Sequence, residues 1–158
     1  VLKKPKVLLR ELVTADADAY RKIAWGEALH TYVSFMEARD IETAERIISR
    51  NTNKYERIYG IVRKPNQQLV GAIIVSWFEP EKEITVHYFI GEKFQHRGFA
   101  REAIIVLSRF VCTDTGWNAE KLVFEIRRTN QPSRMLQKSL GSTLVNETLK
   151  YFTYEYSL

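Results

Sequence analysis

The sequence predicts an α+β fold in which helices pack on a mixed, mostly antiparallel sheet of about seven strands. Two observations lead to this prediction. Three consecutive apolar segments are joined by short turns, which is typical of an antiparallel meander. A long amphipathic helix, an apolar strand and another helix follow, which is typical of a sheet with helices on its faces. The chain has 158 residues, 45% of them hydrophobic and 27% charged, so we expect residues 1–158 to form a single domain.

The chain opens with a predicted strand followed by a helix. The strand covers residues 7–13 and ends at Thr14. Thr14 is a favoured residue type for a helix N-cap, and Asp16 and Asp18 then fall in the first turn, where negative charge stabilises the helix dipole. We expect this helix to run to about Ala24.

A second helix is predicted after an ambiguous segment. Residues 27–39 have a pattern that fits either a helix or irregular structure. Asp40 is a suitable N-cap, and apolar residues then recur with helical spacing. These residues are Ile41, Ala44, Ile47 and Ile48.

The hydrophobic period then changes to that of strands. Residues 57–62, 69–78 and 84–90 are rich in apolar and β-branched side chains. The intervening segments 64–67 and 79–81 carry proline, asparagine or glutamate, which favour turns. Three strands joined in this way predict the meander.

The clearest helix follows the meander. It begins near Ala100 and ends near Gly116, a residue favoured just past the end of a helix. Its single apolar face consists of Ala100, Ala103, Ile104, Leu107 and Phe110.

The last part of the chain alternates between strand and helix. Residues 121–127 form an apolar, β-rich segment, and a helix is predicted over 130–140, with Pro132 in its first turn and Gly141 past its end. The last two predicted strands cover residues 143–145 and 151–156.

Composition excludes several classes of protein and site. Cys112 is the single cysteine, so an intrachain disulfide is impossible, and we expect it to be a small apolar residue within a helix. With a single cysteine we also expect no metal site. Apolar runs such as residues 103–107 are short, so we expect no membrane partner, no signal peptide and a cytoplasmic location. The net charge of +5 is spread evenly, so no basic stripe points to nucleic acid.

The segment Gln95-His96-Arg97-Gly98-Phe99-Ala100-Arg101 joins a predicted strand to the clearest helix. Successive backbone N–H groups at such a junction can bind phosphate. Gly98 allows close approach of a phosphate to the backbone, and Arg97 and Arg101 supply positive charge. An ordinary strand-to-helix loop would fit the same residues.

Two motifs together resemble the GNAT superfamily of Gcn5-related N-acetyltransferases, and within it the ribosomal-protein-alanine N-acetyltransferase branch. Gln95-x-x-Gly98-x-Ala100 is similar to the pyrophosphate signature of that family. Asn130-x-x-Ser133 is similar to its Asn-x-x-Ser helix start, and the order of elements also matches. The resemblance implies a three-layer α/β/α fold whose sheet is splayed between strands 84–90 and 121–127.

The resemblance also implies a binding mode for acetyl-CoA as co-substrate. The pantetheine arm pairs with the backbone near Phe89 and Ile90, as an added strand would. The pyrophosphate lies on the N–H groups of residues 96–101. Asn130 and Ser133 lie just past the second splayed strand, where Asn130 bonds the pantetheine, caps the helix, or does both.

Acetyl transfer to an amine needs a base, and the sequence offers several candidates. Alternation predicts that Glu83 and His87 share one face of strand 84–90, and a histidine titrates near neutral pH. Members of the branch commonly have a small residue at the position that His87 occupies here, and a glutamate at the position of Thr85. The sequence departs from the pattern of the branch at both positions. Ser133 is the remaining hydroxyl candidate, because Gln137 stands where related families place a tyrosine as general acid.

The acceptor pocket is predicted from the fold that the resemblance implies, because its first two helices flank the cleft. Its candidate residues are Trp25, Tyr32, Phe35, Met36 and Trp77. We expect the acceptor to be a protein N-terminus or a small-molecule amine, and the protein to be a monomer or a homodimer. The alternatives are a catalytically silent domain that binds acyl-CoA and a basic domain that binds nucleic acid.

Overall fold

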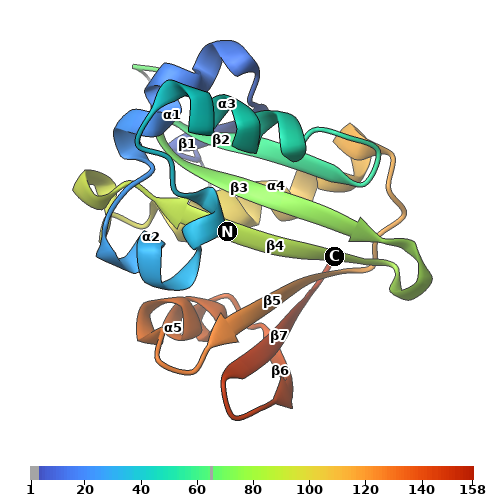
Figure 1. Ribbon diagram of the computed structural model, residues 1–158. Helices are drawn as coiled ribbons and strands as arrows, with labels where there is room; N and C mark the ends of the chain where they lie inside the picture. The colour runs from blue at the N-terminus through green and yellow to red at the C-terminus, as the bar shows by residue number, and fades with distance from the viewer. Residues whose placement is uncertain (1–3, 65) are drawn as a thin grey trace.

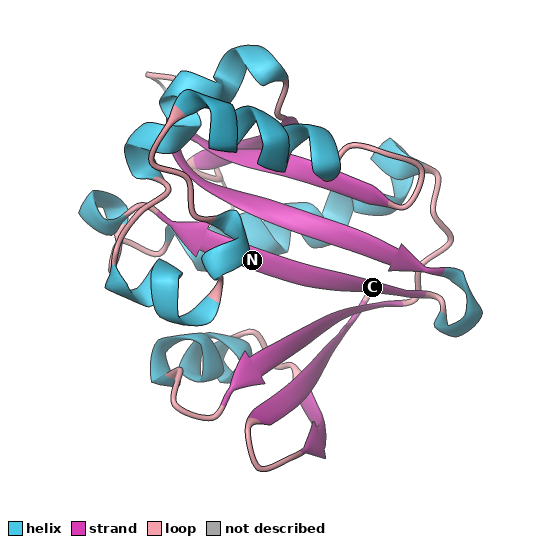
Figure 2. Ribbon diagram, viewed as in Figure 1, coloured by secondary structure: helices cyan, strands magenta, loops and turns pink. Residues whose placement is uncertain are grey.

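A seven-stranded sheet forms the centre of the molecule in the computed structural model, which describes residues 4–64 and 66–158 (Figures 1 and 2). Its strand order is β1-β2-β3-β4-β5-β7-β6. The strands are β1 (Val7–Glu11), β2 (Glu56–Arg63), β3 (Gln68–Phe78), β4 (Glu83–Ile90), β5 (Lys121–Arg127), β6 (Thr143–Glu147) and β7 (Tyr151–Ser157). All neighbouring strands are antiparallel except β4 and β5, which are parallel. The predicted mixed, mostly antiparallel sheet and the meander are confirmed.

Helices cover both faces of the sheet. They are α1 (Ala17–Ile23), α2 (Glu27–Tyr32), α3 (Ile41–Arg50), α4 (Phe99–Thr115) and α5 (Gln131–Ser139), with short 3₁₀ turns η1 (Thr14–Asp16), η2 (Ser34–Met36), η3 (Glu79–Glu81) and η4 (Glu92–Phe94). Figure 1 shows α1 and α3 on one face and α4 behind the other. Each face has its own buried cluster, one around Tyr20 and Ile48 and the other around Ile104 and Leu107. The predicted three-layer α/β/α arrangement is therefore confirmed.

The N-terminal region differs from the sequence prediction in one respect. Thr14 is not a helix N-cap but the first residue of η1, and α1 begins only at Ala17. The reason is the carboxylate of Asp16, which accepts hydrogen bonds from the Val13 N–H and from the Arg10 guanidinium. These bonds hold a turn between strand and helix. The strand predicted to reach residue 13 accordingly ends at Glu11.

The remaining elements follow their sequence signals closely. Asp40 caps α3 by accepting a hydrogen bond from the Thr43 N–H at 2.7 Å. The ambiguous segment 27–39 contains α2 and η2, and Gly116 follows α4 in the left-handed conformation, at φ 78°. Cys112 lies half-buried in α4. The turn predicted at 64–67 includes Pro65, which, like residues 1–3, lies outside the described residues.

Strands β4 and β5 pair over a very short stretch. Their register joins only Glu83 to Lys121, Ile84 to Leu122, and Thr85 to Val123. In the part of the chain that the structure describes, pairing between the two strands stops there, and Figure 1 shows β5, with β7 beside it, turning away from β4. The predicted splay is confirmed. No helix of the described residues is long and apolar enough to cross a membrane.

Candidate active site

A cavity of about 590 Å³ occupies the gap between the diverging strands. Its walls come from α2, η2, β4, the start of α4, β5 and the start of α5. This volume is in the range of binding sites for small organic ligands. The cavity exists because β4 and β5 part after Thr85, leaving the edge of β4 at residues 86–90 without a neighbouring strand on that side.

One end of the cavity is formed by the loop that enters α4. His96 and Gly98 both have positive φ, at 64° and 81°, so the chain turns sharply and presents backbone N–H groups at the helix N-terminus. A Cβ added at Gly98 would meet nothing within 4 Å, so the space above the loop is open to a ligand. The loop is tied to β4 by Gln95, whose side-chain amide donates to the carbonyl of Ile90 at 3.1 Å.

Most of the residues predicted to bind the coenzyme lie together at this end. Arg97 is exposed on the same loop, and Arg101 adds a second positive charge at the cavity wall. The side chain of Phe99 is buried in the core, so Phe99 would contact a ligand through its backbone. The predicted coenzyme-binding residues that line the cavity are Phe89, Ile90, Gln95, His96, Gly98, Phe99, Ala100, Arg101, Asn130 and Ser133. A diphosphate fits the positive charge and the free N–H groups of this end.

The free edge of β4 forms one side of the cavity. Phe89 is buried, and its ring packs edge-on against Tyr20 with ring centres 5.7 Å apart. Beyond Thr85 the backbone of β4 has no strand beside it on the β5 side, and the Ile90 carbonyl there accepts from the Gln95 amide. An extended ligand with amide groups can pair with such an edge.

His87 lies in the wall of the cavity between its two ends. Its ring packs edge-on against Phe35, with centres 5.0 Å apart. Burial of the imidazole lowers the pKa of His87 below its usual value of 6.5. The ring is therefore neutral at physiological pH, which is the state that accepts a proton.

Glu125 is a cavity residue that sequence reasoning missed. Continuing the β4–β5 register beyond Thr85 and Val123 places Glu125 level with His87 on the opposite strand. Both side chains line the cavity, and that of Glu125 is exposed to solvent. The available signal was a carboxylate at an outward-facing position in the otherwise apolar segment 122–126.

A second missed residue is Tyr88, which reaches from β4 to α5. Its hydroxyl lies 2.9 Å from the Ser133 hydroxyl, and burial raises the pKa of Tyr88 to about 12. Ser133 in turn donates its backbone N–H to the side chain of Asn130 at 3.3 Å. Asn130 therefore caps α5, as predicted. No signal in the sequence joins position 88 to position 133.

Comparison with known proteins shows the family to which the chain belongs. The model of the acetyltransferase (GNAT) domain family matches residues 6–143. The chain belongs to the GNAT family. The resemblance seen in its motifs is confirmed, and this GNAT protein is an acyltransferase.

Solved structures of other acetyltransferases share the fold of this GNAT protein. RimL, a ribosomal L7/L12 alpha-N-protein acetyltransferase in complex with coenzyme A, has a TM-score of 0.82 at 16% identity, covering 100% of this chain and 97% of that chain. The Salmonella typhimurium enzyme that modifies the N-terminal serine of L7/L12 has a TM-score of 0.81 at 16% identity, covering 98% and 96%. The microcin C7 self-immunity acetyltransferase MccE, in complex with acetyl-CoA and AMP, has a TM-score of 0.78 at 17% identity, covering 98% and 94%. No curated protein matched the chain.

Two positions of interest in this GNAT protein lie away from the cavity. Glu83 lies at the closed end of the splay, 3.8 Å from the ammonium group of Lys121, and is not a wall residue. Gln137 is fully buried, and its side-chain oxygen accepts a hydrogen bond from the Ser142 hydroxyl at 2.7 Å. The structure therefore places neither side chain beside His87 and Glu125.

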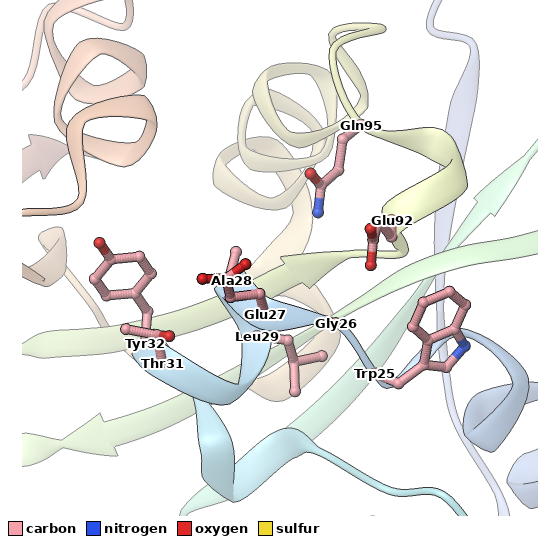
Figure 3. Close-up of a pocket in the computed structure, with 9 residues that line it drawn as sticks. All are labelled: Trp25, Gly26, Glu27, Ala28, Leu29, Thr31, Tyr32, Glu92 and Gln95. Carbon is pink, nitrogen blue, oxygen red and sulfur yellow. The ribbon is translucent and has the colours of Figure 1, made fainter.

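The predicted acceptor residues of this GNAT protein separate into two groups. Tyr32 and Phe35 line the main cavity. Tyr32 also borders a neighbouring hollow of about 410 Å³, whose wall includes Trp25. Figure 3 shows the side chains of Glu92 and Gln95 pointing from the loop before α4 toward α2 across this hollow.

Met36 and Trp77 line neither the main cavity nor the neighbouring hollow. Met36 is fully buried in the core with α1 and α3. Trp77 stacks on Trp117, with ring centres 5.9 Å apart, and Arg57 covers the Trp117 ring. This stack packs against the core on the α4 face of the sheet.

Proposed function

We propose that the protein, acting as one domain over residues 1–158, transfers the acetyl group of acetyl-CoA directly to a primary amine. The parting of β4 and β5 is the observation that carries the proposal. It creates a continuous cavity from the loop of residues 95–101 to His87 and Glu125, which line it from the two parted strands. A long donor molecule and an acceptor can meet in such a cavity.

Acetyl-CoA is the co-substrate, and the residues at the α4 end fit its parts. The free N–H groups near Gly98, together with Arg97 and Arg101, suit a pyrophosphate. The edge of β4 beyond Thr85 has no strand beside it on the β5 side, and near Phe89 and Ile90 it suits the amide groups of the pantetheine arm. The Gln95 amide already occupies the Ile90 carbonyl there. This placement directs the thioester toward His87.

The acceptor amine must lose a proton before it attacks the thioester carbon. His87 is neutral near pH 7 because its pKa is lowered, so it accepts this proton directly or through water. Glu125 attracts the ammonium form of the amine into the cavity from the opposite strand. The new C–N bond then forms, the C–S bond breaks, and an unpaired β4 N–H stabilises the oxyanion in between.

The charge of the cavity favours an acceptor with one amino group. Glu125 is the one carboxylate among the described residues that line the cavity. A polyamine with several ammonium groups would leave most of its charges unpaired there. We therefore propose the N-terminal amine of a protein as the first acceptor class, which the structural similarity to RimL supports.

A panel of amines tests this function. Release of CoA thiol would be followed with purified protein, acetyl-CoA, and peptides that begin with alanine or serine. The same peptides with blocked N-termini, free lysine and a polyamine are the controls. Acetylation of unblocked peptides alone supports the proposal, and preference for the polyamine would overturn the acceptor class. Tight CoA binding without transfer to any amine would indicate the catalytically silent alternative.

A further inference from the structure

The hydrogen bond between Tyr88 and Ser133 connects two elements across the splayed region. Tyr88 belongs to the stretch of β4 that has lost its β5 neighbour, and Ser133 lies in the first turn of α5. Both residues line the cavity. The contact satisfies the buried Tyr88 hydroxyl, and it also places a hydrogen-bonded pair of hydroxyls at the cavity wall.

The Ser133 hydroxyl is not needed to begin α5. Asn130 performs the capping by accepting the Ser133 backbone N–H. Among the described residues, the Tyr88 hydroxyl is the one hydrogen-bond partner of the Ser133 hydroxyl. Either hydroxyl can donate in this bond. In the arrangement in which Tyr88 donates, the Ser133 oxygen accepts. The proton of Ser133 is then free to point into the cavity.

We propose that Tyr88 is a positioning residue that orients the Ser133 hydroxyl to donate a hydrogen bond to the sulfur of CoA as the thioester breaks. This inference rests on the proposed function. When the C–S bond breaks, its electron pair stays on sulfur, and the proton lost by the amine goes to the base or to water. Ser133 stabilises the resulting thiolate without giving up its proton.

Relative acidities decide between donating a hydrogen bond and transferring a proton. An ordinary thiol has a pKa of about 8.5, and that of Tyr88 is about 12. Full transfer from Tyr88 through Ser133 to the thiolate is therefore unfavourable. A hydrogen bond to a charged group needs no transfer and is stronger than a bond between neutral groups.

The pKa of the bound CoA thiol tests this role independently of any acceptor. Ultraviolet absorbance of the thiolate would be followed against pH in complexes of CoA with the wild type, Tyr88→Phe, Ser133→Ala and the double variant. We expect the thiol pKa to rise by about one unit in each single variant, with no further rise in the double variant. Ser133→Thr, which keeps a hydroxyl, should restore the wild-type value.

Tyr59→Phe is the matched control, because Tyr59 also has a partly buried hydroxyl, bonded to Asp114 at 2.6 Å, but lies outside the cavity. In transfer assays we expect Tyr88→Phe to lower kcat about tenfold while KM for acetyl-CoA stays within twofold.

An unchanged thiol pKa in Tyr88→Phe and Ser133→Ala would overturn the inference even if the protein is an active transferase. A shifted thiol pKa without transfer to any amine would reject the proposed function and leave this hydrogen bond supported. Failure of the wild type to bind CoA would reject both.

Discussion

The hydroxyl of Tyr32, in α2, donates a hydrogen bond to the carbonyl oxygen of Thr129, in the turn after β5, at 3.1 Å. The two residues lie 97 positions apart in the sequence, one in a helix and the other in a turn. Tyr32 lines both the main cavity and the neighbouring hollow. This bond therefore connects α2 to the turn between β5 and α5 at the wall of the cavity.

Replacing Tyr32 by Phe should loosen that connection without emptying the space that the ring fills. We expect the free energy of unfolding to fall by about 1 kcal/mol, and KM for the acceptor to rise by up to about tenfold. Chemical denaturation and steady-state kinetics measure the two effects. Tyr55→Phe is the control, because Tyr55 is exposed and lies outside the cavity. Equal acceptor KM values in the two variants would contradict this role.

Gly98→Glu should abolish binding of acetyl-CoA. The new side chain would occupy the open space above the loop and place a negative charge where the pyrophosphate is expected. Gly116→Glu is a matched control, because Gly116 is also left-handed, also faces open space, and lies at the other end of α4. Calorimetric titration with CoA should show binding only for the control, after thermal melting has shown that both variants fold.

His87→Ala should reduce kcat more than it changes the affinity for acetyl-CoA, by roughly a hundredfold if His87 is the base. The lowered pKa of His87 also predicts the pH profile. The acidic limb of kcat/KM in the wild type should have its midpoint below pH 6.5. A midpoint above this value, or a profile that does not change in His87→Ala, would show that another group titrates.

The same lowered pKa makes a prediction about stability. Below pH 6.5 the unfolded chain binds a proton at His87 while the folded protein does not, so protonation favours unfolding. The wild type should therefore lose stability as the pH falls from 6.5 toward the folded-state pKa. His87→Gln should lose less over that interval, as measured by denaturation at several pH values.

Glu125→Gln should raise KM for a cationic amine by about tenfold and leave the affinity for acetyl-CoA unchanged, because it removes a charge without changing shape. Raising the salt concentration should reduce the difference between variant and wild type. Glu120→Gln serves as the control, since Glu120 pairs with Lys82 outside the cavity. A loss of kcat with unchanged acceptor KM would instead identify Glu125 as the base.

The loop that enters α4 and the start of α5 could be predicted from sequence because their signals are local. Gly98, the helix that follows it and the cap at Asn130 each depend on neighbours within a few residues. Glu125 and Tyr88 could not be predicted in the same way. Their roles depend on the register of two strands far apart in sequence and on the placement of α5.

Two of the misplaced predictions have different causes. Thr14 has the residue type of a cap, but the competing partner of Asp16 is Arg10, on the preceding strand. Trp77 has the residue type of a pocket aromatic, but period-two alternation does not say which face of the sheet carries the cavity. Its stacking on Trp117 assigns it to the other face.

The short pairing between β4 and β5, which covers three residues of each strand, affects how the stability of the protein depends on its co-substrate. While it is bound, a pantetheine arm lying along the free edge of β4 would hydrogen-bond to the backbone there, as an added strand would. Binding only to the folded chain adds about 2.7 kcal/mol of stability at a ligand concentration one hundred times Kd. Amide hydrogens of residues 86–90 should then exchange with solvent more slowly, and the lifetime of the protein would rise and fall with the supply of acetyl-CoA.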